Sequence, residues 1–150
     1  MDWKKLCDDV AQWAEAHRDE FVKDISDVCR IRSTSHNQLD CTNAPFGQAC
    51  RDMLDKALEM SSAYGFETRN YDNFCGSAVY GSNPDNDSIG IFSHMDIVPE
   101  GEGWTHDPFD PILSEDGKYL FARGSCDNKS CGIMALYAMR YLKEHNIKLK

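Results

Sequence analysis

Hydrophobic side chains recur at helical spacing in three stretches of the chain. Over the first 30 residues they repeat every three or four positions, with a break near Asp19, which is the period of an amphipathic helix. The same spacing predicts a helix over 48–64, where Gly65 is placed to form the C-terminal cap. A further helix is predicted over 129–144. The pattern therefore predicts helices near both ends of the chain and one between them.

Short runs of apolar residues between these helices predict strands. Two are expected near 66–71 and 74–80, and another at 119–122. The run 89–92 is apolar without alternation, which is typical of a strand covered on both faces. A further strand is expected to begin at 147–150. Helices and strands in this order predict an α/β fold, with a mixed sheet flanked by helices.

Polar residues, glycines and prolines mark the connections. We expect loops at 36–47 and 99–118, and a turn at 83–87, where Asn-Pro-Asp-Asn-Asp occurs. The sequence has no internal repeat, low-complexity tract or linker. Residues 1–150 are therefore interpreted as part of one domain.

Composition and charge exclude several classes of function. The 150 residues include 16 Lys and Arg against 25 Asp and Glu, a net charge of −9. This balance argues against nucleic acid as a partner, because phosphate contacts need clustered cations. No apolar run approaches the ~18–20 residues that cross a membrane, so no membrane partner is expected. The seven cysteines are irregularly spaced, which favours reduced thiols in a cytoplasmic protein.

A histidine and an aspartate follow the apolar run 89–92. His94 is placed at the carboxyl end of the predicted strand, where ligands bind in open α/β sheets, and a neutral imidazole is a good zinc ligand. Asp96 projects to the same side if the strand continues, and it is then placed to accept a hydrogen bond from the other ring nitrogen. On spacing alone, the alternative is a polar pair at the end of a strand.

A second candidate lies between the predicted strand 119–122 and the helix over 129–144. Asp127 precedes this helix, so its carboxylate is placed to face a cation at the sheet edge and to bridge two metal ions. The alternative is an ordinary helix start, with Ser125 or Asp127 as the N-cap. His106, in the predicted loop, is interpreted as a surface or packing histidine.

Several motifs occur together in an order and at a spacing that resemble one known family. They are His94-Met95-Asp96-Ile97-Val98-Pro99, Gly103-Trp104 with Asp107-Pro108-Phe109, and Arg123-Gly124 with Asp127 and Lys129. On these residues the chain resembles the co-catalytic zinc peptidases, which include peptidase V, aminoacylase and acetylornithine deacetylase. The segments 44–47, 65–68 and 78–81 are similar to the peptidase V-type dipeptidases in particular.

The resemblance implies a zinc-dependent hydrolase of dipeptides. It implies that His94 is a terminal metal ligand, that Asp127 is the carboxylate bridging two zinc ions, and that Asp96 is a catalytic residue that orients His94. Cobalt or manganese would suit the same ligands. In the family, a metal-activated water cleaves the amide bond, and the peptide after the bridging aspartate, here Asp127–Asn128, is commonly cis.

Other parts of the family's site are not found in the sequence. Ser130 and Cys131 stand where the family usually has Gly-Pro, and the general-base glutamate and the remaining ligands would come after Lys150. The family's inserted second domain is missing too. We therefore expect residues 1–150 to form the N-terminal portion of a zinc-exopeptidase-like catalytic domain, incomplete at its C-terminal end and inactive when isolated.

Two alternatives stay open. A deacylase of the same family would act on N-acyl amino acids instead of dipeptides, and the determinants that separate these substrates lie mostly downstream. A non-catalytic remnant would serve as an interaction module. Association into a homo-oligomer is compatible with each of these interpretations.

Overall fold

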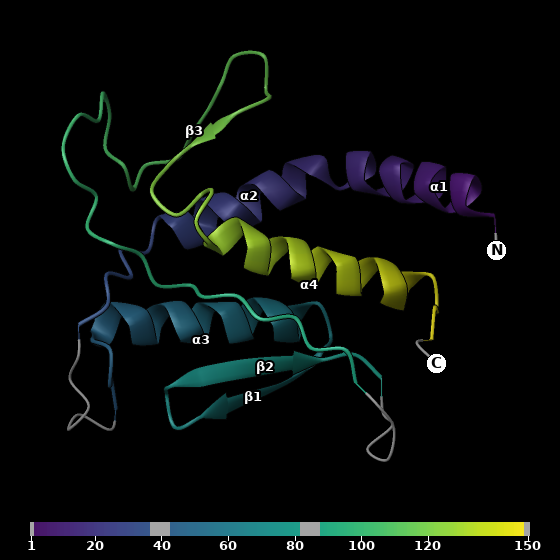
Figure 1. The fold of residues 1–150 in the computed structure, drawn as a ribbon, viewed down its shortest axis with the longest axis horizontal. Coiled ribbons are helices and arrows are strands. Elements are labelled where there is room, and N and C mark those ends of the chain that lie inside the picture. Colours follow the sequence, from purple (N-terminus) through teal and green to yellow (C-terminus); the bar gives the residue numbers. More distant parts are fainter. Residues whose placement is uncertain (1, 37–42, 82–87, 149–150) are drawn as a thin grey trace.

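Four helices and four strands make up the part of the chain that the computed structural model describes, residues 2–36, 43–81 and 88–148. In chain order they are α1 Trp3–Ala16, α2 Arg18–Cys29, α3 Gln48–Ala63, β1 Glu67–Tyr71, β2 Cys75–Val79, β3 Ile112–Leu113, β4 Leu120–Phe121 and α4 Lys129–Glu144. Figure 1 shows α2, α4 and α3 one beside the next, with the β1–β2 hairpin on the far side of α3. The predicted combination of helices and strands is confirmed.

The N-terminal helical stretch is two helices, broken at His17. Asp2 caps α1 by accepting hydrogen bonds from the amides of Lys4 and Lys5 at 3.1 and 3.2 Å. His17 ends this helix, and its Nδ1 lies 2.8 Å from the carbonyl oxygen of Trp13. None of the residues of α1 is buried. Its link to the rest of the molecule is Trp13, which packs against the core and donates to Glu144 of α4 at 2.7 Å.

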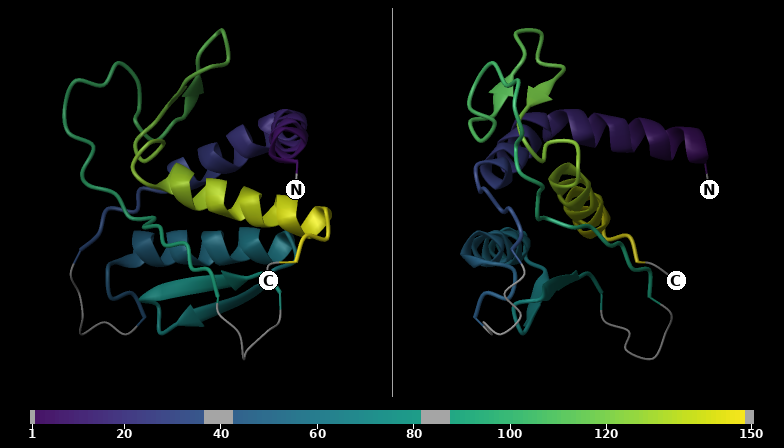
Figure 2. Two further views of the ribbon diagram at one scale, coloured as in Figure 1. Left: turned by 45° about the vertical axis from the view of Figure 1, so that its right-hand side comes forward. Right: turned by 60° about the vertical axis from the view of Figure 1, so that its left-hand side comes forward.

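The core lies mainly between α2, α3 and α4, and the two views in Figure 2 show these helices packed together with the hairpin against α3. Gly65, at φ +75°, turns the chain after α3 as the sequence predicted. The helices predicted over 48–64 and 129–144 are also confirmed, and each supplies buried side chains. The buried cluster consists of Ile25, Val28, Cys29, Met53, Met60, Phe66, Ala122, Ile133, Leu136 and Tyr137.

The hairpin packs closely on α3. Its strands β1 and β2 pair antiparallel, with Glu67 opposite Val79, which confirms both strands predicted in this region. A Cβ atom at Gly76 would lie 2.7 Å from Leu58 Cδ2 of α3. Because such a distance is inside van der Waals contact, a side chain at this position would displace the end of Leu58, and Gly76 lets the hairpin approach without that shift.

A buried aspartate ties the three core helices together. Asp24 of α2 accepts hydrogen bonds from the hydroxyls of Tyr64 and Tyr137, at 2.5 and 2.9 Å. Arg140 of α4 lies over the Tyr64 ring, 3.9 Å from its centroid, and pairs with Glu20 at 3.0 Å. Each of these buried charges thus faces a partner, as burial of a charge requires.

The apolar run 89–92 is not the covered strand that the sequence predicted. It forms no strand, and Ile89 and Phe92 are 77% and 96% exposed to solvent. A strand is stabilised by hydrogen bonds from a neighbouring strand, and no described residue pairs with this run. The parallel pairing found nearby among the described residues is an isolated bridge between Thr34 and Ile97. The expected mixed sheet is therefore limited, in the described ranges, to two antiparallel pairs and this bridge.

The loop expected over 99–118 contains a short strand that the sequence did not predict. This strand, β3, pairs antiparallel with β4, which confirms the strand predicted at 119–122. Ser114 Oγ shapes the turn between them by accepting hydrogen bonds from the amides of Lys118 and Tyr119, at 3.1 and 3.0 Å. Side-chain hydrogen bonds of this kind are not visible in hydrophobic spacing, which explains why β3 was not predicted.

Three further expectations fall wholly or partly outside the described residues. Positions 37–42 of the loop expected at 36–47 lie outside them. The turn predicted at 83–87 lies entirely outside them, as do the last two positions of the strand expected at 147–150. The first two positions of that stretch are described and form no strand. Among the described helices, none is long and apolar enough to span a bilayer.

Candidate functional site

His94 lies on a segment that is held from one side by the chain after α2. The Ile97 amide donates to the carbonyl oxygen of Ser33 at 3.0 Å, and Ser33 Oγ donates to the carbonyl oxygen of Met95 at 2.7 Å. Ser33 itself is fully buried. These two hydrogen bonds fix the backbone immediately after His94.

The start of α4 holds the same segment from the other side. Ser93 Oγ donates to the carbonyl oxygen of Asn128 at 3.2 Å. One turn into the helix, a Cβ atom at Gly132 would lie 2.8 Å from Met95 Sδ, so the absence of a side chain permits this close approach. The segment that carries His94 therefore packs directly on the start of α4.

The structure brings the three residues singled out in the sequence into one group. His94 Nδ1 lies 3.1 Å from Asp96 Oδ1, and His94 Nε2 lies 3.2 Å from Asp127 Oδ1. The side chains are open to solvent, with 53% of His94 and 85% of Asp127 exposed. Both ring nitrogens of one imidazole therefore face carboxylates at a position that a ligand can reach.

This arrangement assigns different tasks to the two carboxylates. If Nδ1 carries the proton, it donates a hydrogen bond to Asp96 Oδ1, and the lone pair of His94 Nε2 is directed toward Asp127. An imidazole nitrogen and a carboxylate oxygen side by side are ligand types that zinc accepts. A carboxylate on the opposite ring nitrogen fixes the tautomer and raises the basicity of the ligand nitrogen.

Asp127 does not serve as a helix cap. The residue that flanks the first turn of α4 is Asn128, and no side chain makes a capping hydrogen bond there. Ser125 Oγ donates instead to the carbonyl oxygen of Ala122 at 2.8 Å. The alternative of an ordinary helix start is therefore not supported. The peptide Asp127–Asn128 is cis, as the resemblance implied.

The donor set in the described residues is small. Among residues 2–36, 43–81 and 88–148, no group of three or more His, Cys, Asp and Glu side chains is arranged to hold a metal ion. Structural and catalytic zinc sites use three or four protein ligands. His94 and Asp127 thus fit a metal ion in chemical type and fall short of a complete site in number.

Sequence reasoning noted Lys129 as part of a motif but gave it no role. Its side chain is fully buried, and Nζ donates to the carbonyl oxygens of Val28 and Ile31 at 2.8 and 2.6 Å. Burial lowers the pKa of this lysine to about 8. The available signal is a charged residue on the buried face of the helix, a feature that Lys129 shares with Arg140, and its partners lie about a hundred positions earlier in the chain.

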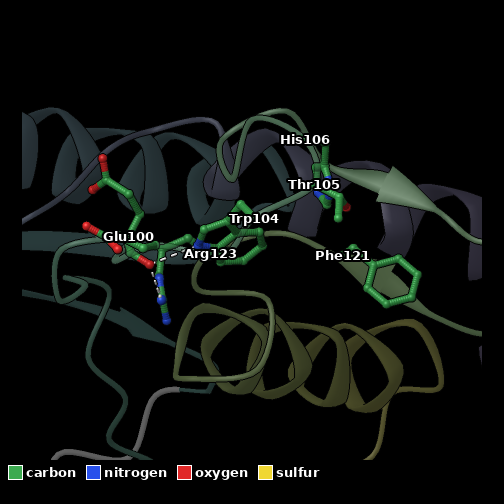
Figure 3. Close-up of a pocket in the computed structure, with 8 residues that line it drawn as sticks. Glu100, Trp104, Thr105, His106, Phe121 and Arg123 are labelled. Carbon is green, nitrogen blue, oxygen red and sulfur yellow. Dashed lines mark hydrogen bonds between the residues drawn. The ribbon is translucent and has the colours of Figure 1, made fainter.

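An open pocket of about 380 Å³ lies beside the loop that follows this site. Figure 3 shows how its backbone is held: Trp104 Nε1 and an Arg123 guanidinium nitrogen both donate to the carbonyl oxygen of Glu100, each at 2.8 Å. The ring of His106 packs edge-on against Trp104, with 5.7 Å between centroids. The residues that line the pocket are Glu100, Glu102, Gly103, Trp104, Thr105, His106, Phe121 and Arg123. His94 and Asp127 are not among them.

Comparison with known proteins adds an independent line of evidence. Residues 90–150 match the model of peptidase family M20/M25/M40. The chain is 36% identical over 137 residues to the Beta-Ala-Xaa dipeptidase of Lactobacillus delbrueckii subsp. lactis. This alignment covers 91% of the chain and 28% of that relative.

A solved structure shares the fold. The crystal structure of human carnosine dipeptidase 1 aligns with a TM-score of 0.65 over 88% of this chain and 30% of that chain, at 24% sequence identity. The chain spans between a quarter and a third of the length of these two proteins. The resemblance on which the sequence analysis relied is thereby confirmed.

Proposed function

We propose that this chain, which is similar to peptidase family M20/M25/M40 over residues 90–150 and to a Beta-Ala-Xaa dipeptidase, forms the N-terminal portion of a metallopeptidase catalytic domain that cleaves dipeptides. In this proposal residues 1–150 supply the first ligands of a metal site and the acid that orients one of them. The observation that carries it is the imidazole of His94 with a carboxylate at each ring nitrogen, 3.1 and 3.2 Å away.

Each residue has a defined task in the proposed site. His94 Nε2 and the Asp127 carboxylate hold the metal, and Asp96 fixes the His94 ring through Nδ1. A divalent ion bound there supplies Lewis acidity for amide hydrolysis. Zinc suits one imidazole and one carboxylate best, and cobalt or manganese can take the same ligands. The exposure of both ligands leaves room for further ligands and for substrate.

We propose that the 150-residue chain does not turn over dipeptides by itself. Two ligands hold a metal weakly, and the described residues bring no third one to the pair. A purified chain incubated with zinc and a β-alanyl dipeptide is expected to release no free amino acid above the protein-free rate. Zinc-dependent release would contradict this part of the proposal.

Zinc titration calorimetry on the purified chain tests the metal site itself. We expect weak binding at one dominant site, which His94→Ala and Asp127→Ala each abolish. His106→Ala is the matched control, because this histidine lies against Trp104 and outside the proposed ligands. Binding that survives both ligand variants, or that His106→Ala removes, would refute the assignment.

The substrate class and the location are also part of the proposal. The Beta-Ala-Xaa dipeptidase relative supports a dipeptide over an N-acyl amino acid as the substrate. The grouped site residues support a working enzyme over a non-catalytic remnant. A cytoplasmic location is supported by the six described cysteines, all of which are free thiols, because disulfides persist mainly in oxidising compartments.

A further inference from the structure

Helix α4 carries a lysine at each end, and each lysine binds carbonyl oxygens near the C-terminus of another helix. At the start of α4, Lys129 Nζ donates to Val28 O at 2.8 Å and to Ile31 O at 2.6 Å, at the end of α2. At the other end, Lys143 Nζ donates to Tyr64 O at 2.5 Å, just after α3. Carbonyl groups at helix C-termini carry partial negative charge, which favours a cation there.

The two lysines differ in burial and in what surrounds them. Lys129 is fully buried, whereas Lys143 is partly exposed. The stem of Lys129 packs beside Gly124 and Ile97, since a Cβ atom at Gly124 would lie 3.0 Å from Lys129 Cδ and 3.1 Å from Ile97 Cγ2. A buried ammonium is tolerated only where hydrogen bonds compensate its lost hydration. The position of Lys129 is therefore tightly determined.

Lys129 is connected to the candidate site through the chain and through the segment after α2. Asp127 precedes it by two residues in the chain. Ile31, whose carbonyl it binds, stands two residues before Ser33. Ser33 in turn bonds the backbone on both sides of Asp96, through Met95 O at 2.7 Å and the Ile97 amide at 3.0 Å.

We propose that Lys129 is a positioning residue that sets the separation between His94 and Asp127. By joining the end of α2 to the start of α4, its ammonium keeps the segment after α2, the His94 segment and Asp127 in one arrangement. It acts through these groups and contacts neither metal nor substrate. The inference deepens the proposed function and rests on it for its metal readout.

Cobalt titration of the full 150-residue chain, followed by visible absorption, tests the inference with Lys129→Met. Loss of the ammonium is expected to weaken cobalt binding by about tenfold to a hundredfold, the usual effect of losing a group that orients a ligand. Lys143→Met is the matched control, because it removes a lysine–carbonyl contact at the other end of α4. It is expected to leave the cobalt affinity within about twofold of that of the parent chain, since the orientation of the ligands is unchanged. Equal affinities in the two variants, weakened or not, would overturn the inference.

Two further measurements keep the inference testable if the first fails. Lys129→Arg retains a charged donor and is expected to bind cobalt more tightly than Lys129→Met, and the reverse order would count against a role for the ammonium. Nuclear Overhauser contacts between Met95 and Gly132 report the docking of the His94 segment on α4 without any metal. They are expected to weaken in Lys129→Met and to persist in Lys143→Met.

These readouts separate the two proposals. A parent chain that binds no cobalt would contradict the proposed metal site. In that case the Met95–Gly132 contacts still decide the role of Lys129, and their persistence in Lys129→Met would overturn it.

Discussion

Two regions of this molecule carry large apolar side chains in opposite environments. In the packed helices α2, α3 and α4, Val28 and Met53 are essentially excluded from solvent. In the segment 88–98, Ile89 and Phe92 are among the most exposed large side chains of the described residues. The helices find their hydrophobic partners within the described chain. In this segment Ile97 does so as well, being only 4% exposed, whereas Ile89 and Phe92 do not.

The difference bears directly on the candidate site, because the site joins the two regions. Asp127 stands at the start of the well-packed α4, and His94 stands on the exposed segment, which is anchored mainly by Ser33 and Ser93. Folding stability should therefore depend on the packed helices, while ligand binding should depend on how the segment docks against them. Substitutions can separate the two properties.

The largest expected effect comes from a matched pair of isoleucine truncations. Ile25→Ala removes a buried side chain from the core of α2 and should lower the free energy of unfolding by about 2–5 kcal/mol, since the cavity only partly collapses. Ile89→Ala, in the exposed segment, should change it by less than about 0.5 kcal/mol. Urea unfolding followed by circular dichroism measures both. Similar losses in the two variants would show that the segment is packed as tightly as the helices.

An intermediate effect is expected from alkaline pH, through the tyrosines bonded to Asp24. Burial and the hydrogen bond to Asp24 raise the pKa of Tyr64 to about 12. Between pH ~10 and ~12 the unfolded chain has lost this proton, whereas the folded chain still holds it. The free energy of unfolding is therefore retained below pH ~10 and falls between pH ~10 and ~12. Thermal melts across this range should show the decline. The decline in melting temperature should be shallower in Tyr64→Phe and unchanged in Tyr119→Phe, which alters an exposed ring. An equal decline in the parent chain and both variants would argue against a role for the hydrogen bond between Tyr64 and Asp24.

The smallest effect on stability is expected at the site itself. The Asp127 side chain is exposed and caps no helix, so Asp127→Ala should change the unfolding free energy by less than about 0.5 kcal/mol. Urea unfolding of this variant beside the parent chain measures the change. A large loss would mean that Asp127 is retained for folding, and its assignment as a metal ligand would lose support.

The parts of the fold that the sequence predicted are those whose signals are local. Apolar spacing located α3 and α4, and Gly65 marked the end of α3 because a positive φ is required there. The prediction for the run 89–92 was wrong because hydrophobicity indicates that a side chain favours burial. It does not indicate whether any of the described residues pack against that side chain. The hairpin formed by β3 and β4 was half missed because the hydrogen bonds of Ser114, not apolar alternation, define its turn.

The candidate site also has residues that the sequence predicted and one whose role it did not predict. His94, Asp96 and Asp127 were identified from motifs, and the structure places each of the two carboxylates within hydrogen-bonding distance of one ring nitrogen of His94. The role of Lys129 was not accessible, because its partners Val28 and Ile31 lie far away in sequence and offer only backbone carbonyls. Any residue at those two positions presents the same acceptor, so the sequence carries no trace of the contact.

The most direct test of the central claim, that His94 and Asp127 are metal ligands, is a crystal of the chain soaked in zinc and examined at the zinc absorption edge. We expect an anomalous peak ~2.0–2.2 Å from both His94 Nε2 and an Asp127 carboxylate oxygen, the distances typical of these ligands. The exposed thiols of Cys126 and Cys131 offer competing soft ligands close by in sequence. A peak at these thiols with none between His94 and Asp127 would contradict the claim.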